Sequence, residues 1–423
     1  MVCVLAGKFL QLRNVIRVLM NVARVPAGLS EQRVKLLIRG FRVLREALRQ
    51  RQQLLGQQDS SQFVPPLRVF YQDAVQIMYG IDGRHTSLYR LIIAYAIWII
   101  LVSGKLRRRL RSFTLMQKRQ LGRNGPLVSV VAFGAWPVGG GLGNVPEEQG
   151  VAAVKAALDV GMTFIDTAEG YETSETVVGK AIRGRRDEVF LATKLSGSDH
   201  SAEHMERAVE NSLRTLGTDY IDLYQLHSPS PEWPISDTME NLVGLRDSGK
   251  IRYIGVSNFS PEQTQEAMQY AVIHSSQPRY NMMWRDLEDD VLPHCLENGI
   301  GVIPHSVLSK GVLAGKHRPG HRFAPDDERR LFDFFRGELF EQAYAVAQRL
   351  DVWARDQGRD IVQLAIAWVL ANPAVSSALV GAKSPEQVYH NAKAADWRLT
   401  PGDLDEIETI MGGFRMSWVK DDP

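Results

Sequence analysis

The chain has 423 residues, 44% of them hydrophobic, and its 50 basic and 48 acidic side chains give a formal net charge of +2. That size accommodates one large domain and an appendage, and the charge is divided unevenly: residues 1–115 carry 19 basic and 5 acidic side chains (net +14) and residues 116–423 carry 31 and 43 (net −12). The asymmetry predicts a basic N-terminal extension and an acidic domain. The two cysteines, Cys3 and Cys295, lie in different regions, which excludes a disulfide framework and indicates a reducing compartment.

The extension begins with a stretch that lacks acidic residues. Met1–Ser30 has the composition of a transit peptide, but its apolar run is too interrupted for a secretory signal. In Ser30–Gln50 apolar side chains recur at helical spacing with arginines largely opposite, which predicts a basic amphipathic helix. Such a helix suits an anionic membrane surface or a partner groove, and the plainer alternative is a core-facing helix with one solvated side.

An uncharged segment, Leu91–Gly104, lies between Arg90 and a basic cluster at 105–109. As a helix this segment would span about 21 Å, less than the roughly 30 Å hydrocarbon core of a bilayer. The region 88–104 is therefore a candidate for membrane association, and insertion would leave the basic cluster and the following domain on the cytoplasmic side. The extension contains no nucleic-acid recognition module, so no nucleic-acid partner is expected.

From Met116 onward, short apolar and β-branched runs alternate with amphipathic segments. Three such segments, Glu148–Val160, Ala202–Leu216 and Thr238–Ser248, run into a glycine that predicts a helix end. Two later helices open with Ser-Pro-Glu-Gln, at Ser260–Gln263 and Ser384–Gln387, and each is predicted to form a capping box. The predicted strands are Val128–Phe133, Thr163–Asp166, Val189–Lys194, Tyr220–His227, Ile251–Ser257, Pro278–Tyr280, Gly301–His305 and Ser377–Gly381.

Eight strands that alternate with helices predict an α/β domain, residues 116–423, built as a (β/α)8 barrel. A doubly wound open sheet is the alternative, because periodicity alone does not prove closure. An open dinucleotide-binding sheet should carry G-x-G-x-x-G after its first strand. The glycine run Gly139–Gly143 lacks that spacing, so it is interpreted as a flexible loop.

Polar residues stand at the ends of successive predicted strands, where the reactive groups of a parallel barrel are found. Asp166 ends one strand and Tyr171 follows in the loop, Lys194 ends the next, His227 ends the third, and the pair 257–258 ends the fourth. One such lysine or histidine would ordinarily be solvated or bound to a loop carbonyl. Four strand ends that converge on one barrel mouth predict a reactive site instead.

The series Asp166, Tyr171, Lys194 and His227 resembles the catalytic tetrad of the aldo-keto reductases in order and spacing. Gly255–Phe259 is similar to the G-[VI]-S-N-[FY] signature of that family. The resemblance covers residues 116–414 and implies NADPH-dependent carbonyl reduction without a metal. It further implies that the nicotinamide carboxamide is held by Ser257, Asn258 and Gln277.

The chemistry explains the residue types. When hydride reaches a carbonyl carbon, negative charge develops on the oxygen and a proton donor is needed. Tyr171 is the candidate acid, and the Lys194 ammonium is expected to lower its pKa, with Asp166 keeping that ammonium charged and oriented. Neutral His227 is expected to donate a hydrogen bond to the carbonyl oxygen.

The resemblance extends to the rest of the cofactor site. The turn that begins at His305 implies pyrophosphate contacts. The basic stretch 317–330 is expected to be either a mobile clamp over the dinucleotide or a solvated charged loop. A helix that starts after Ser384 would offer free N–H groups to a 2′-phosphate, which favours NADPH over NADH. The residues implied in cofactor binding here are His305, Ser306, Leu308, Lys316, Ser384, Gln387 and Asn391.

Two departures from the family pattern concern the cofactor. His305 replaces the aromatic residue that usually stacks on the nicotinamide, and His390 replaces a glutamate common near the adenine. Trp136, Trp233 and Trp284 are either core residues or borders of the substrate pocket.

The sequence predicts an oxidoreductase, either cytoplasmic or membrane-tethered, that reduces an aldehyde, ketone or sugar to an alcohol. An alternative from another class is an NADPH-sensing regulatory subunit of a membrane partner, since the family also includes channel-associated subunits. A complete tetrad disfavours an inactive scaffold. Met116–Gly122 resembles the usual start of bacterial members, so an over-extended reading frame is a further interpretation of residues 1–115.

Overall fold

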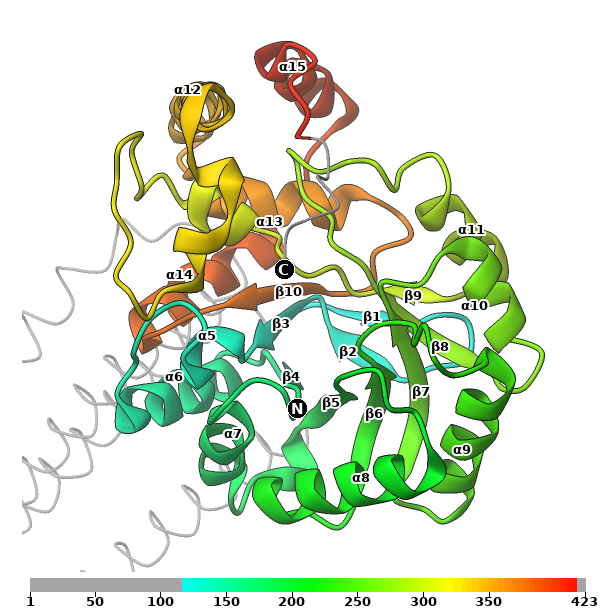
Figure 1. The fold of residues 1–423 in the computed structure, drawn as a ribbon. Coiled ribbons are helices and arrows are strands. Elements are labelled where there is room, and N and C mark those ends of the chain that lie inside the picture. Colours follow the sequence, from blue (N-terminus) through cyan, green and yellow to red (C-terminus); the bar gives the residue numbers. More distant parts are fainter. Residues whose placement is uncertain (1–115, 417–423) are drawn as a thin grey trace, which may run out of the picture. The chain divides into compact units, whose positions relative to one another are not determined.

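Eight parallel strands form the centre of the computed structural model, which describes residues 116–416; the expectations for residues 1–115 lie outside the described residues. The strands follow the order β10-β3-β4-β5-β6-β7-β8-β9, so all neighbours but one are consecutive in sequence (Figure 1). Their bounds are β3 Val131–Gly134, β4 Phe164–Asp166, β5 Phe190–Leu195, β6 Ile221–Leu226, β7 Ile251–Ser257, β8 Ile273–Gln277, β9 Gly301–Val302 and β10 Ala378–Gly381.

Backbone hydrogen bonds join the last strand of this order to the first. Val302 N–H donates to the carbonyl of Ala374 at 3.0 Å, and Ser376 N–H donates back to the carbonyl of Val302 at 2.8 Å. Leu379 N–H then donates to the carbonyl of Pro304 at 3.1 Å. The sheet therefore curls back on itself, which confirms the predicted (β/α)8 barrel and excludes the open sheet.

Helices alternate with the strands and cover the outside of the barrel (Figure 1). The predicted helices at 148–160, 202–216 and 238–248 correspond to α6, α8 and α9, and α8 ends at Gly217 with a φ of +67°. No helix among residues 116–416 is long and apolar enough to cross a membrane. The α-helices are α5 Trp136–Gly139, α6 Glu147–Asp159, α7 Ser174–Ile182, α8 Ala202–Leu216, α9 Ile235–Asp247, α10 Pro261–Ala267, α11 Val291–Asn298, α12 Gly337–Asp356, α13 Ile361–Ala371, α14 Pro385–Ala392 and α15 Pro401–Met411.

Five 3-10 helices complete the described elements: η1 Arg186–Glu188, η2 Ser309–Ala314, η3 Glu328–Leu331, η4 Asp333–Phe335 and η5 Lys393–Asp396. Three of them, η2, η3 and η4, lie in the long connection between β9 and α12. Long connections on a rigid scaffold are where binding functions are commonly found.

Two apolar clusters fill the domain. The larger one lies between the sheet and the helices. The smaller one fills the barrel interior with side chains such as Phe164, Ala192 and Leu223. Leu121 and Val128 from an antiparallel hairpin, β1 Lys118–Gln120 and β2 Leu127–Ser129, belong to the inner cluster, so this hairpin plugs the barrel. With its interior filled, the barrel exposes reactive groups only at its mouth.

Two strand predictions were wrong in position. The run predicted at 128–133 divides between the hairpin strand β2 and the barrel strand β3, because they are separate strands with different partners. The strand predicted at 278–280 lies earlier, as β8, and ends at Gln277. Pro278 lacks a backbone N–H and is where the ladder stops, while the polar residues of β8 conceal its buried character in the sequence.

Of the two predicted capping boxes, only the one at Ser260 is complete. At the start of α14, the Ser384 side chain accepts from Gln387 N–H. The side-chain oxygen of Gln387, Oε1, accepts from Lys383 N–H at 2.7 Å and not from the N–H of the capping residue Ser384. The glycine run also differs from a plain loop. Gly139 ends α5, and a Cβ on it would come within 2.3 Å of the Tyr171 carbonyl oxygen, so glycine permits a close approach to the loop that carries Tyr171.

Candidate active site

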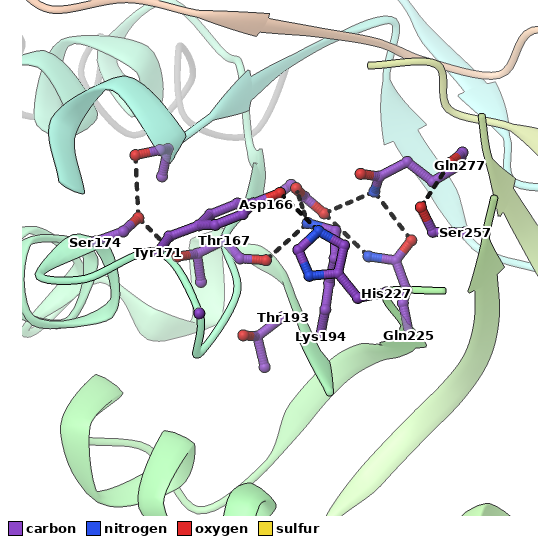
Figure 2. Close-up of polar contacts among 12 residues, drawn as sticks. Asp166, Thr167, Tyr171, Ser174, Thr193, Lys194, Gln225, His227, Ser257 and Gln277 are labelled. Atoms are coloured by element: carbon purple, nitrogen blue, oxygen red, sulfur yellow. Dashed lines mark hydrogen bonds and ion pairs between the residues drawn. The ribbon is translucent and has the colours of Figure 1, made fainter. Parts of the chain in front are cut away.

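The inward side chains of neighbouring strands change from apolar to polar toward the mouth of the barrel. Phe164 is followed by Asp166 two residues later on β4, and Leu223 by Gln225 on β6. Lys194 on β5 is directly paired in register with Gln225. Because side chains alternate across a strand, these polar groups form one layer above the apolar interior (Figure 2). The polar layer comprises Asp166, Lys194, Gln225, Ser257 and Gln277.

At the centre of the layer, the Lys194 ammonium lies 2.5 Å from Asp166 Oδ1 and donates to the carbonyl of Thr167 at 2.9 Å. Lys194 is completely buried and Asp166 is 3% exposed. Burial alone would lower the pKa of Lys194, but the Asp166 carboxylate, followed by Tyr171, outweighs it and the pKa is raised. The ammonium therefore remains charged inside the barrel, as the sequence predicted.

The other oxygen of Asp166 is held by two amides. Gln225 Nε2 and Gln277 Nε2 each donate to Asp166 Oδ2 at 3.0 Å (Figure 2). Gln277 Nε2 also lies 3.1 Å from Gln225 Oε1. The carboxylate is thus fixed by three side chains from three strands, so it has little freedom to turn away from Lys194.

Tyr171 extends from the β4–α7 loop to this group. Its hydroxyl lies 3.3 Å from His227 Nε2, and the Lys194 ammonium lies 4.9 Å from the centre of its ring (Figure 2). We expected Lys194 to lower the pKa of this phenol. Lys194 does act in the expected direction, but burial raises the pKa of Tyr171 more than Lys194 lowers it, so the net shift is upward. The cause is desolvation, which disfavours the phenolate.

His227 follows β6 and faces the Tyr171 hydroxyl. Burial, with a smaller contribution from the Lys194 charge, lowers the pKa of His227 to about 3. The imidazole is therefore neutral at physiological pH, in agreement with the sequence-based expectation. Its second nitrogen, Nδ1, lies 3.0 Å from the hydroxyl of Ser196.

The end of β7 adds a second set of amides and hydroxyls. Ser257 donates to the carbonyl of Gln277 at 2.7 Å. Asn258 has a φ of +59° and donates from Nδ2 to the carbonyl of His227 at 3.0 Å, and its Nδ2 also lies 3.2 Å from Ser257 Oγ. A non-glycine residue in this strained region is uncommon and typical of functional sites.

A groove with a volume of about 1670 Å³ leads away from the tetrad. This volume exceeds the usual range of about 300–1,000 Å³ for pockets that hold one small ligand. Two of the predicted site residues are not in the lining: Lys194, which is completely buried, and Ser384, which caps α14. The predicted residues that line the groove are Asp166, Tyr171, His227, Ser257, Asn258, Gln277, His305, Ser306, Leu308, Lys316, Gln387 and Asn391.

The residues that depart from the family pattern also line the groove. His305 Nδ1 lies 2.9 Å from Ser306 Oγ, and burial followed by nearby cations lowers the pKa of His305 well below its ordinary value. A neutral imidazole can stack on an aromatic ring. At the far end His390 Nε2 lies 2.5 Å from Asp360 Oδ2. Trp136 and Trp284 line the groove and Trp233 does not.

The residues 317–330, which we call the strap, cross to the loop after α5. Asp327 pairs with Leu142 in an antiparallel bridge, and Glu328 N–H donates to the carbonyl of Gly141 at 3.3 Å. Asn144 N–H donates to Asp326 Oδ2 at 3.1 Å. The strap thus has fixed contacts on the far side of the groove, while the predicted mobility stays a prediction.

Sequence reasoning missed four residues of the site. Gln225 carried a signal, since it is a polar residue in the inward phase of a buried strand. Lys310 contacts Trp136 and Phe332, with its ammonium 4.4 and 3.8 Å from the ring centres, but its position in a turn left no pattern. The remaining two are Ser196 and Lys383.

Comparison with known proteins shows which family the chain is similar to. The model of the aldo/keto reductase family matches residues 130–411. The aldo-keto reductase YhdN of Bacillus subtilis (strain 168) is 38% identical over 310 residues, which are 70% of this chain and 94% of that protein. A probable voltage-gated potassium channel subunit beta of Oryza sativa subsp. japonica is 32% identical over 323 residues, covering 70% of this chain and 97% of that protein.

Solved structures of the same family are also similar to this chain. A glycerol dehydrogenase from Gluconobacter oxydans has a TM-score of 0.65 and 32% identity, covering 73% of this chain and 98% of its own. An aldo/keto reductase from Klebsiella pneumoniae in complex with NADP and acetate has a TM-score of 0.58 and 32% identity, covering 72% and 98%. The chain therefore belongs to the aldo/keto reductase family, whose general activity is nicotinamide-dependent carbonyl reduction.

Proposed function

We propose that this protein reduces an aldehyde, ketone or sugar carbonyl with NADPH, and that Tyr171 is the general acid. The observation that carries the proposal is the convergence of the Tyr171 hydroxyl and His227 Nε2, 3.3 Å apart, beside a buried ammonium. Two hydrogen-bond donors at that separation can both reach one carbonyl oxygen. The resemblance of the tetrad to that of the family supports the same roles.

Each residue contributes to the proton side of the reaction. NADPH, when bound, supplies the hydride to the carbonyl carbon. Because the pKa of Tyr171 is raised by burial, the phenol carries its proton at neutral pH and can release it to the carbonyl oxygen. The Lys194 ammonium stabilises the phenolate left behind, and Asp166 holds that ammonium in place. Neutral His227 orients the carbonyl by a hydrogen bond.

The groove supports a dinucleotide as the cofactor, and its basic far end favours NADPH over NADH. Lys316, Arg318 and Lys383 line it near the start of α14, where helix N–H groups also favour an anion. The related structure from Klebsiella pneumoniae contains NADP. In this proposal Ser257, Asn258 and Gln277 hold the carboxamide, His305 stacks on the nicotinamide, Ser306, Leu308 and Lys316 contact the pyrophosphate, and Ser384, Gln387 and Asn391 serve the adenosine end.

The test uses the full-length chain and follows NADPH oxidation with 4-nitrobenzaldehyde, methylglyoxal and glyceraldehyde. We expect multiple turnovers with at least one of these carbonyls. Tyr171→Phe should lower kcat by at least about a hundredfold, because it removes the acid, and should leave NADPH binding within about twofold. A Tyr171→Phe variant with turnover like that of the wild type would refute the assignment.

A second function is favoured by one specific observation, the 32% identity to a probable potassium channel beta subunit. A regulatory subunit that senses NADPH would bind the cofactor on the same barrel. The experiment above separates the two functions. Tight NADPH binding with at most one slow turnover on every carbonyl would favour the sensor, whereas rapid multiple turnover would favour the enzyme.

A further inference from the structure

Ser196, which follows β5, contacts the nitrogen of His227 that faces away from Tyr171. Its hydroxyl oxygen lies 3.0 Å from His227 Nδ1 and accepts from Gly170 N–H at 3.3 Å. With one lone pair of the oxygen engaged by Gly170, the hydroxyl still has its own proton to donate. Among the described residues, His227 Nδ1 is the acceptor that the geometry offers to it.

The direction of this hydrogen bond decides the tautomer of His227. A neutral imidazole carries one proton, so when Nδ1 accepts, the proton is on Nε2. The imidazole is neutral at physiological pH, since burial lowers the pKa of His227 to about 3. Nε2 is the nitrogen on the Tyr171 side, where the substrate oxygen is expected.

We propose that Ser196 is a positioning residue that holds His227 in the tautomer protonated on Nε2, so that the Nε2–H donates to the carbonyl oxygen of the substrate. The inference rests on the proposed reductase function for its consequence, but the tautomer itself is a property of the protein alone.

Further contacts hold Ser196 between the loops that carry the tetrad. Ser196 N–H donates to Glu169 Oε1 at 2.7 Å, two residues before Tyr171. His227 N–H donates to the carbonyl of Leu195 at 3.0 Å. The loop that carries Tyr171, the end of strand β5 that carries Lys194 and the segment that carries His227 therefore meet at Ser196.

Gly170 permits this arrangement. A Cβ at position 170 would lie 2.8 Å from Ser196 Oγ and 3.1 Å from Ser196 Cβ, so any larger residue would displace the serine. The hydroxyl reaches His227 because the residue opposite has no side chain. If the half-buried Ser196 hydroxyl only contacted solvent, it would not need a residue without a side chain at position 170.

The opposite tautomer is the competing possibility that the experiment must separate. In it the Tyr171 hydroxyl would donate to Nε2, and Nδ1–H would donate to Ser196. His227 would then accept at the substrate side and lose its role as a donor to the carbonyl. Nitrogen-15 NMR separates the two forms, because protonated and unprotonated ring nitrogens have well-separated chemical shifts.

The experiment uses full-length protein labelled with nitrogen-15 histidine at neutral pH. The chain has 10 histidines, so the His227 signals are assigned by their loss in His227→Gln. We expect a protonated Nε2 and an unprotonated Nδ1 in the wild type. Ser196→Ala should shift His227 to a mixture of tautomers, and Ser196→Thr, which keeps the hydroxyl, should restore the wild-type pattern.

Kinetics supply the second measurement. With NADPH and the best carbonyl of the three named above, Ser196→Ala should lower kcat about tenfold, because the hydrogen bond from Nε2 is strongest in the transition state. The Kd for NADPH should change less than about twofold. Ser198→Ala is the matched control, since Ser198 Oγ donates to Glu232 at 3.1 Å and does not bind His227; it should match the wild type in both measurements.

Two results would overturn the proposal. One is a wild-type protein with the proton of His227 on Nδ1, which is decided without any variant. The other is a Ser196→Ala protein whose tautomer is that of the wild type. Absence of turnover in the wild type would refute the reductase function instead and would leave the tautomer result standing, so the two failures are distinguishable.

Discussion

The Lys194 ammonium shows how single residues govern this site. A charge removed from water costs several kcal/mol unless partners compensate it. The Lys194 ammonium has a single counter-charge, the Asp166 carboxylate, and it also donates a hydrogen bond to the carbonyl of Thr167. Asp166 has more support, since Gln225 and Gln277 also donate to it. The loss of one partner should therefore affect the two charges unequally.

We predict that Asp166→Asn destabilises the protein more than Lys194→Met does. The asparagine amide would place its own N–H groups against those of Gln225 and Gln277, and the Lys194 ammonium would lose its counter-charge. We expect the free energy of unfolding to fall by about 3 kcal/mol. Lys194→Met leaves a carboxylate that still accepts two amide hydrogen bonds, so its cost should be about half as large. Urea unfolding of both variants measures the difference, and an equal or reversed order would contradict this account.

The same residues show how far sequence reasoning reaches. Asp166, Lys194 and His227 were predictable because polar groups at the ends of buried strands stand out against an apolar pattern. Ser196 was not predictable, since a serine beside a glycine is typical of any loop and only its contact with His227 distinguishes it. The direction of the pKa shift of Tyr171 was also beyond the sequence, because it depends on the extent of burial.

At the scale of elements, strands were predicted well where their buried residues are apolar. The strand β7 was predicted with its full bounds, Ile251–Ser257. The strand β8 was displaced because four of its five residues are His, Ser, Ser and Gln, which periodicity assigns to a loop. Its buried serines face close neighbours, and a Cβ on Gly255 would lie 2.2 Å from Ser275 Oγ. Such crowding is a tertiary property that local pattern does not express.

One contact between elements makes stability depend on pH. Glu175 in the first turn of α7 is 7% exposed and accepts from Thr193 Oγ1 of β5 at 2.7 Å. Burial raises the pKa of Glu175 above its ordinary value of 4.5, while the Thr193 hydrogen bond opposes the shift. The folded state therefore binds the proton more tightly than the unfolded state. Protonated Glu175 therefore contributes to the stability of the protein below pH 4.5, and this contribution is lost as the pH rises through the folded-state pKa of Glu175.

We predict that Glu175→Gln stabilises the protein at pH 8 and that its advantage over the wild type shrinks toward pH 4. Glutamine keeps the acceptor for Thr193 without a charge to bury. Thermal unfolding of both proteins from pH 4 to pH 8 measures the difference. Thr193→Val should do the reverse and steepen the fall in stability, because it removes the hydroxyl that supports the carboxylate. A pH-independent difference for Glu175→Gln would contradict the assignment.

In the domain as a whole, barrel closure brings β3 and β10, the first and last barrel strands along the chain, together beside one groove. Gly134 on β3 is paired with Gly381 on β10, although 247 residues separate them. The strap adds a second connection, from the segment after β9 to the loop after α5. A ligand in the groove is thus bordered by residues of both the first and the last barrel strand, and its release requires either a free end of the groove or an opening of the strap.

We therefore predict that weakening the strap speeds cofactor release without changing the chemistry. Asp326→Ala removes the acceptor for Asn144 N–H, and the dissociation rate of NADPH should rise about two- to fivefold, the effect expected for one exposed hydrogen bond. Displacement of NADPH in a stopped-flow fluorimeter measures that rate. Asp333→Ala is the matched control, because Asp333 pairs with Arg336 outside the strap at 3.0 Å. Equal rates for Asp326→Ala and wild type would mean that the cofactor leaves by another route, and equal acceleration in Asp333→Ala would mean that the effect is general to the loop.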